Sequence, residues 1–248
     1  MTTDTGKPDE PPPNVLLSGI VGSVAYGLDT EDSDVDRLGV FAAPTERLLG
    51  LHPPKPSVVS SKPDATFHEA GKFASLALNV NPTITELMWL PGDLYETRTE
   101  LGDNLIAIRH RFLSRSRVRN AYLGYATQQF RRLENRGDGS FSADTRKRTA
   151  KHARHLARLV RQGMELYGSG WLTVRLEDPE WYRDFGERVA AGDLEAGRAE
   201  IGRAERWMND THTPLPERPD EATVEVWLQE VRQAHYGMEA RHGVALRH

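Results

Sequence analysis

Strand-like and helix-like patterns occupy different parts of this chain, and this division limits the folds open to it. Four segments have the length and composition of strands: residues 15–21, 34–41, 57–60 and 64–68. The last two could form a hairpin around Lys62-Pro63. From Glu69 onward the apolar residues recur at spacings of three and four, which is typical of helices. Strands followed by helices predict an α+β protein, with a small mixed sheet and a helical bundle beside it.

Helical patterns account for nearly all of the chain after residue 100. Two short helices begin near Glu69 and Pro82, and longer ones are expected at residues 101–112, 118–135, 143–167, 179–191, 194–208 and 221–241. The resulting organisation is a flexible tail at 1–13, a mixed α/β domain at 14–100 and a helical domain at 101–248.

The composition excludes several classes of protein. The 248 residues contain no cysteine, which removes disulfides, thiolate nucleophiles and cysteine zinc sites together. No apolar run reaches the ~18 residues that suggest a membrane helix. The N-terminus lacks the basic and apolar segments of a signal peptide. We therefore expect a cytoplasmic protein without a membrane partner, and no pattern indicates a particular oligomeric state.

A glycine-serine turn followed by two carboxylates is the pattern with the clearest chemical meaning. Gly22-Ser23 ends the first predicted strand, and Asp34-Val35-Asp36 opens the second. If Val35 lies on a strand, Asp34 and Asp36 point to the same face. Paired carboxylates repel unless a cation lies beside them, and such oxygen ligands suit Mg²⁺ together with substrate phosphates. Because Gly22-Ser23 can bring backbone N–H groups and a hydroxyl to those phosphates, the pattern predicts metal-dependent nucleotidyl transfer.

These residues resemble the signature of the DNA-polymerase-β-like nucleotidyltransferase superfamily, in which Gly-Ser is followed after a spacer by Asp-x-Asp. The chain is most similar to a branch of predicted nucleotidyltransferases associated with RNA repair. The similarity extends over residues 15 to 176. The matching segments are Gly22-Ser23-x-Ala25-Tyr26-Gly27, Ser33-Asp34-x-Asp36-x-x-Gly39-Val40, Lys72-Phe73, Asn81-Pro82-x-x-x-Glu86-Leu87 and Lys151-His152-x-x-His155-Leu156-x-Arg158-Leu159.

The resemblance implies a catalytic domain at 14–100 that transfers a nucleoside monophosphate from a nucleoside triphosphate to a hydroxyl group. Mg²⁺ or Mn²⁺ would be bound by Asp34, Asp36 and a third carboxylate, because two metal ions about 4 Å apart usually need one. The superfamily places this third acid on a neighbouring strand. Asp64 opens a strand-like segment and is the first candidate, and Glu69 is the second.

Side chains that could bind the nucleotide lie in three segments. The candidates are Gly22, Ser23, Tyr26, Lys72, Lys151, His155 and Arg158. The last three share one face of a helix, because their spacings are four and three. Most of these candidates also have an ordinary interpretation: Ser23 as a helix cap, Tyr26 as a packing residue and Lys72 as solvated surface. The three helix residues could equally form the solvated basic face of an ordinary amphipathic helix.

A block of basic residues indicates an anionic partner. The net charge of the chain is −4, yet residues 109–161 contain fifteen Lys or Arg and only three acids, a local charge of +12. The helical domain therefore has a basic part at 101–176 and acidic C-terminal helices at 177–248. Solvated arginines on long helices are the ordinary interpretation, whereas phosphate contacts to an RNA end fit a block that follows a transfer site.

We therefore expect an RNA acceptor, in repair or tailing, bound through the basic region 109–161. Two alternatives stay open. The acceptor could be a protein, as in toxin–antitoxin-type AMPylation, or a small molecule. The chain could also be a non-catalytic RNA- or nucleotide-binding module, although both Asp34 and Asp36 are present.

Overall fold

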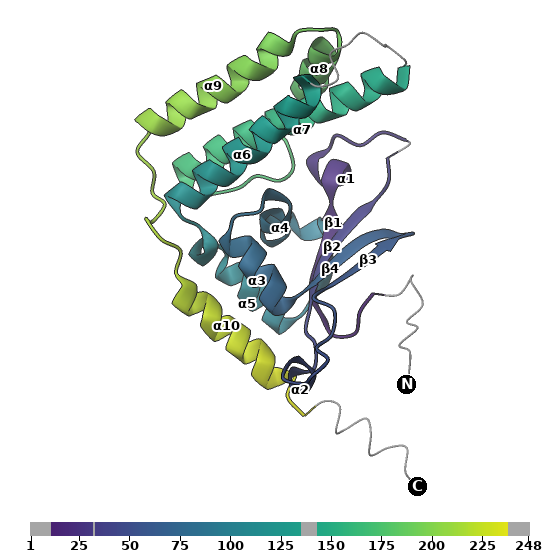
Figure 1. Cartoon of the computed structure of the whole chain (residues 1–248), viewed down its shortest axis with the longest axis vertical. Helices are drawn as coiled ribbons and strands as arrows, with labels where there is room; N and C mark the ends of the chain where they lie inside the picture. The colour runs from purple at the N-terminus through teal and green to yellow at the C-terminus, as the bar shows by residue number, and fades with distance from the viewer. Residues whose placement is uncertain (1–10, 32, 135–142, 238–248) are drawn as a thin grey trace.

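The computed structural model describes residues 11–31, 33–134 and 143–237 and shows a sheet with a helical bundle at one end (Figure 1). Most of the expected tail at 1–13 lies outside these residues, as does the end of the helix expected at 221–241. The fold is α+β, as the sequence predicts: a mixed sheet precedes a helical region.

The sheet has five strands in the order β3-β4-β2-β1-β5. They are β1 (Val15–Val21), β2 (Asp36–Phe41), β3 (Ser57–Ser61), β4 (Asp64–Glu69) and β5 (Tyr95–Arg98). β1 pairs antiparallel with β2 and β5, and β3 forms the expected antiparallel hairpin with β4. β2 and β4 are parallel, so their first residues meet at the same end of the sheet.

The second strand begins two residues later than the sequence predicts. Its pairing with β1 ends at Val21 and Asp36, because Gly22 turns the chain away with a φ of 72°. Asp34 and Val35 therefore precede the strand, and Val35 is 38% exposed. The expectation that Asp34 and Asp36 lie on one strand and point to the same face is therefore wrong, because only Asp36 belongs to β2.

The first five helices lie around the sheet. The next four build the bundle, and the last helix returns to pack against the third and the fifth. The first group is α1 (Gly22–Tyr26), α2 (Thr45–Leu48), α3 (Ala70–Leu78), α4 (Pro82–Glu86) and α5 (Glu100–Ala107). The second is α6 (Arg115–Glu134), α7 (Ala143–Ser169), α8 (Pro179–Ala190), α9 (Leu194–Asp210) and α10 (Glu221–Ala234). The helix that was expected to begin near Pro82 ends at Glu86, and a 3₁₀ turn at Leu87–Trp89 follows it.

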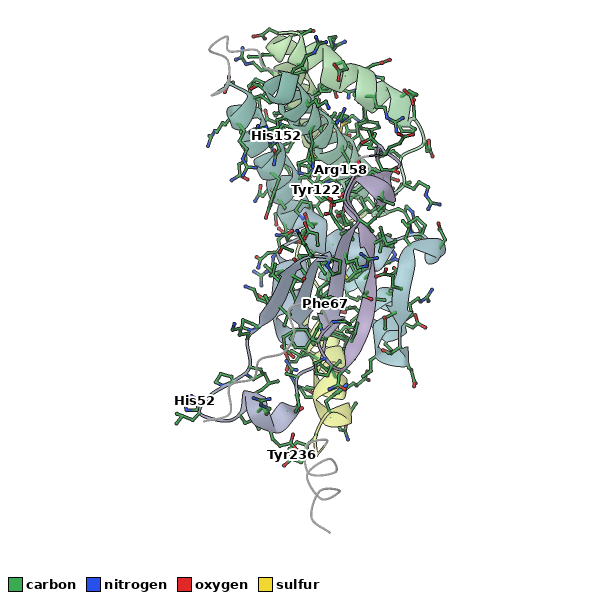
Figure 2. The ribbon with its side chains drawn as sticks, turned by 90° about the vertical axis from the view of Figure 1, so that its right-hand side faces the viewer. His52, Phe67, Tyr122, His152, Arg158 and Tyr236 are labelled. Atoms are coloured by element: carbon green, nitrogen blue, oxygen red, sulfur yellow. The ribbon has the colours of Figure 1, made fainter. Side chains whose placement is uncertain are left out.

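The main hydrophobic core is continuous between the sheet and the bundle. It includes Leu17 of β1, Phe73 of α3 and Leu156 of α7, all fully buried. A smaller cluster around Phe67 lies on the opposite face of the sheet, which Figure 2 shows toward the viewer. Within the described part of the chain, no helix is both long and apolar enough to cross a membrane.

Candidate active site

A cavity of about 360 Å³ lies where the end of the sheet meets the bundle. Its wall includes Gly22 and Ser23 of α1, the first residues of β2 and β4, and Lys151 and His155 of α7. Segments more than a hundred residues apart in sequence therefore meet at this place. Most of the residues predicted for metal and nucleotide binding lie around this one cavity.

The turn after β1 requires glycine at its first position. Gly22 has a left-handed backbone with a φ of 72°, and a Cβ atom there would lie 2.3 Å from Asp36 Oδ2. The backbone of Gly22 thus approaches the carboxylate directly. The cap position of α1 is Val21, with no side-chain cap bond, so Ser23 does not cap this helix.

Asp36 and Asp64 are neighbours at the start of two parallel strands. The register pairs Arg37 with Ala65, which places the two preceding aspartates side by side at the cavity. Burial raises the pKa of Asp36, and the charges of Asp64 and Asp34 raise it further, whereas Lys151 lowers it. The three carboxylates therefore interact electrostatically, even though Asp34 lies outside the strand.

Glu69, the competing metal ligand, lies at the other end of β4. It pairs in register with Phe41, about 16 Å along the strand from Asp64. Its carboxylate is buried, accepts a hydrogen bond from Gly71 N at 2.8 Å and forms an ion pair with Arg232. Glu69 therefore caps α3 and binds α10 rather than facing the cavity.

The donor set at the cavity suits a hard divalent cation. Asp36 and Asp64 line it and offer only oxygen ligands, and Mg²⁺ is usually held by one or two carboxylates with water and substrate phosphates. Asp34, which was predicted as a third member of this set, does not line the cavity, and only its charge reaches Asp36. Among the described residues, no three acidic, imidazole or thiol side chains converge closely enough to form a complete metal site. Asp36 and Asp64 are therefore the described carboxylates that could hold a metal ion at this cavity.

Two cationic side chains of α7, Lys151 and Arg154, also line the cavity. Lys151 is exposed and close enough to Asp36 to lower its pKa. Arg154 also lines the cavity and makes no hydrogen bond or ion pair with another described residue. Arg154 was not among the residues predicted to bind the nucleotide, although its spacing of three from Lys151 places both on one helix face. Lys72 is different: it is exposed on α3 and does not line the cavity.

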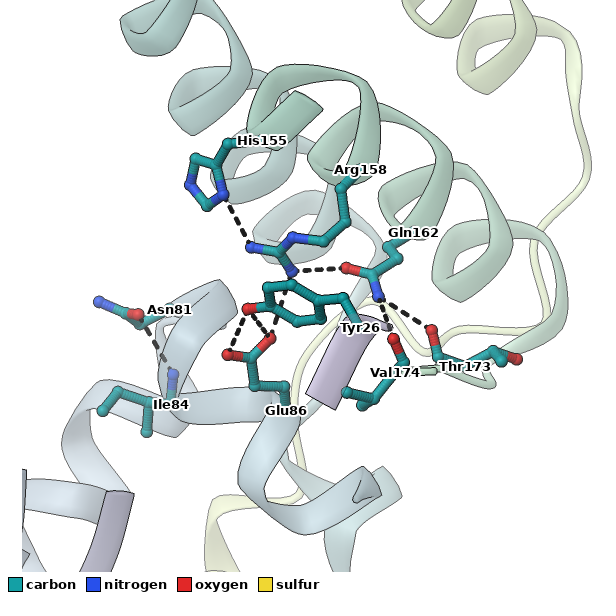
Figure 3. Close-up of polar contacts among 9 residues, drawn as sticks. All are labelled: Tyr26, Asn81, Ile84, Glu86, His155, Arg158, Gln162, Thr173 and Val174. Atoms are coloured by element: carbon teal, nitrogen blue, oxygen red, sulfur yellow. Dashed lines mark hydrogen bonds and ion pairs between the residues drawn. The ribbon is translucent and has the colours of Figure 1, made fainter. Parts of the chain in front are cut away.

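A buried polar network forms the floor of the cavity (Figure 3). The hydroxyl of Tyr26 donates to both oxygens of the Glu86 carboxylate, each at 2.8 Å. Arg158 Nη1 donates to Glu86 Oε2 at 3.2 Å, and its guanidinium lies 3.9 Å from the centre of the Tyr26 ring. The side chains of Arg158 and Glu86 are only 2% and 1% exposed.

Burial sets the electrostatics of this network. It raises the pKa of Glu86, an effect that the Arg158 charge and the hydrogen bonds from Tyr26 and Arg158 oppose. It also raises the pKa of Tyr26 well above its usual value, so the phenol keeps its proton. Tyr26 and Arg158 thus bind a protein carboxylate, and a direct contact of either with a nucleotide stays a prediction.

The sequence also matches a known family. The model of RlaP, described as RNA repair pathway DNA polymerase beta family, matches residues 8–197, more than three quarters of the chain. The matched range contains every residue named above that lines the cavity, and it ends within α9. No curated protein matches the chain.

Proposed function

Because the chain belongs to the RNA repair pathway DNA polymerase beta family, we propose that it is a metal-dependent nucleotidyltransferase acting on an RNA end. It would transfer a nucleoside monophosphate from a nucleoside triphosphate to a hydroxyl group and release pyrophosphate. One observation supports this function most directly. A single cavity combines the Gly22-Ser23 turn, the neighbouring Asp36 and Asp64 carboxylates and the cations Lys151 and Arg154.

Each group at the cavity has a place in this reaction. The hydroxyl oxygen forms a bond to the α-phosphorus, the bond from that phosphorus to the departing pyrophosphate breaks, and the hydroxyl proton passes to a carboxylate of the Asp34/Asp36 pair. Gly22 and Ser23 would hold the β- and γ-phosphates, with Lys151 and Arg154 offsetting their charge. Mg²⁺ or Mn²⁺, held by Asp36, Asp64 and Asp34, would stabilise the charge on the transferred group.

The basic region 109–161 divides into two parts in the structure. Its first part is paired with acidic residues near the start of α10: Arg111 with Asp220 at 3.5 Å, Arg115 with Glu217 at 2.9 Å and Arg117 with Glu221 at 3.0 Å. These acids offset much of the positive charge there. This part is therefore the weaker candidate for binding the acceptor.

The second part of the basic region includes Lys151 and Arg154, which line the cavity, and further cations that do not. Arg131, Arg132, Lys147 and Arg148 are exposed and form no ion pair with any residue that the structure describes. A contact of 2.9 Å between His152 and Gln129 aligns the antiparallel helices α6 and α7, so these cations gather at one end of the pair. We assign the RNA acceptor to this end, which we call the α6–α7 basic end.

Label transfer tests the reaction and identifies the acceptor. The purified chain is incubated with each of the four α-³²P nucleoside triphosphates and Mg²⁺ or Mn²⁺, together with total RNA, tRNA and cell protein. The Asp34→Ala/Asp36→Ala double variant should lose all transfer. The control is Asp29→Asn, because Asp29 is an exposed acid of the same loop and does not line the cavity.

The distribution of label decides between the possible functions. Label on RNA that the double variant does not produce supports the proposal and identifies the preferred base. Label on a protein band would establish protein nucleotidylation instead. No label on any acceptor, combined with RNA binding that needs neither metal nor nucleotide, would indicate a non-catalytic binding module and refute the proposal.

A further inference from the structure

The hydrogen bond between Arg158 and His155 determines which nitrogen of the imidazole carries the proton. Arg158 Nη2 lies 3.0 Å from His155 Nδ1. A guanidinium can only donate hydrogen bonds, so Nδ1 must accept and cannot carry a proton. The single ring proton of His155 is therefore on Nε2.

Glu86 holds Arg158 in the position that this hydrogen bond requires. Figure 3 shows the guanidinium between His155 on one side and the Glu86 carboxylate on the other. Arg158 Nη1 also donates to Gln162 Oε1 at 2.7 Å, and Gln162 donates in turn to the carbonyl of Thr173 at 2.9 Å. With the Tyr26 ring against its face, the guanidinium has no room to rotate.

The surroundings of His155 keep its ring uncharged. Burial lowers its pKa to about 3, together with the charges of Arg158, His152 and Lys151 on α7 and Arg132 on α6. A second ring proton would also place an N–H group against a guanidinium that has no lone pair to accept it. His155 is therefore a neutral hydrogen-bond donor, unlike the charged Lys151 beside it.

We propose that Glu86 is a positioning residue that acts through Arg158 to present His155 Nε2–H to a phosphate oxygen of the bound nucleotide. This inference rests on the proposed function for the identity of the phosphate. His155 lines the same cavity as Lys151 and Arg154, so its donor joins two cations in the cavity wall. Since Nδ1 is engaged and Nε2 is protonated, His155 does not accept the hydroxyl proton.

Nitrogen-15 NMR of the full chain reports directly which ring nitrogen of His155 carries the proton. The His155→Gln variant assigns the His155 signals by their loss. We expect one neutral ring with its proton on Nε2 throughout pH 5 to 8, and a shift of the Nε2–H signal on addition of inorganic tripolyphosphate with Mg²⁺. A proton on Nδ1, a titration within this range, or an Nε2–H signal that tripolyphosphate leaves unchanged would overturn the proposal.

A pair of carboxylate variants tests the role of Glu86. Glu86→Gln removes the charge on α4 that holds Arg158. Glu165→Gln alters an acid on α7 that accepts a hydrogen bond from Thr173 N at 3.0 Å and does not contact Arg158. We expect only Glu86→Gln to produce a mixture of His155 tautomers and to lower kcat/KM about tenfold. Unchanged His155 signals in Glu86→Gln, or equal effects in both variants, would contradict the assignment.

Two substitutions of His155 keep the proposal testable if Glu86→Gln does not fold. Glutamine can accept from Arg158 and donate to a phosphate without titrating, so His155→Gln should retain transfer and tripolyphosphate binding within about threefold. His155→Ala should lose about tenfold in both. Equal behaviour of the two variants would exclude a donor role. If the wild-type chain transfers no nucleotide, the proposed function fails, but the tautomer and the tripolyphosphate shift still decide this proposal.

Discussion

Two acidic side chains of β4 have different environments, although both were candidates for the third metal ligand. Asp64 is exposed next to Asp36 and lines the cavity. Glu69 is 5% exposed and is engaged by Arg232 and by the backbone of Gly71. The first environment suits a ligand that must exchange with metal and substrate, whereas the second suits a structural anchor.

Substitutions of these two acids should therefore separate activity from stability. Asp64→Asn is expected to reduce label transfer at least ~100-fold with little change in the unfolding midpoint, because an exposed side chain contributes little to packing. Glu69→Gln should lower the free energy of unfolding by about 2 kcal/mol, since it weakens a buried ion pair and a helix cap. Urea denaturation and label transfer are measured on both. Loss of transfer in a stable Glu69→Gln variant, with Asp64→Asn active, would reverse the assignment.

The neutral state of His155 should make the folded protein sensitive to acid. The unfolded chain binds a proton at this histidine near pH 6.5, whereas the folded chain does so only near a pKa of about 3. Between these values the unfolded state binds more protons, so the free energy of unfolding falls as the pH falls. From pH 7 to pH 5 the wild type should lose up to about 2 kcal/mol more than His155→Gln in urea denaturation. Parallel pH profiles for the two proteins would show that His155 binds its proton equally readily in the folded and unfolded states.

Elements with a strong local pattern were predictable, and those that depend on a distant partner were not. The apolar run of β1 and the β3–β4 hairpin have the patterns that define them. β5 has only four residues, none of them fully buried, and exists because it pairs with the edge of β1. No periodicity in so short a segment could have revealed it.

The same limit applies to the candidate site. The strand–turn pattern and helical spacing predict the residues that line the cavity, including Gly22, Asp36 and Lys151. Glu86 received no role from the sequence, because its partner Arg158 is 72 residues away and on another helix. Only the packing of α4 against α7 shows that the two charges neutralise each other.

The α6–α7 basic end should dominate binding of single-stranded RNA. Each phosphate contact on a single strand contributes about 0.7 to the slope of log affinity against log salt concentration. The Lys147→Ala/Arg148→Ala variant should therefore reduce the slope by about 1.4 in titrations of a labelled RNA oligonucleotide. Arg115→Ala is the control, since Arg115 is exposed but already paired with Glu217. A larger effect in the control would place the RNA at the first part of the basic region.

The last helix returns from the bundle to the sheet, and it lies outside the part of the chain that matches the family. Figure 1 shows α10 running beside α3 and α5 toward α2. Trp227 Nε1 donates to the carbonyl of Leu101 at 3.0 Å, and the Thr45 hydroxyl donates to the carbonyl of Arg232 at 2.6 Å. α10 thus connects the end of the chain to elements of its first half.

This arrangement predicts that α10 is part of the cooperative folding unit. Trp227 is 2% exposed and belongs to the core shared by the sheet and the bundle, so Trp227→Ala should lower the free energy of unfolding by about 3–5 kcal/mol. Val226 neighbours it on the same helix but is 55% exposed, and Val226→Ala should change stability by less than about 0.5 kcal/mol. Urea denaturation is followed by circular dichroism and by tryptophan fluorescence. Coincident transitions with the larger loss in Trp227→Ala are expected because one core links the whole molecule. A separate early transition would show that α10 folds independently of the rest of the chain.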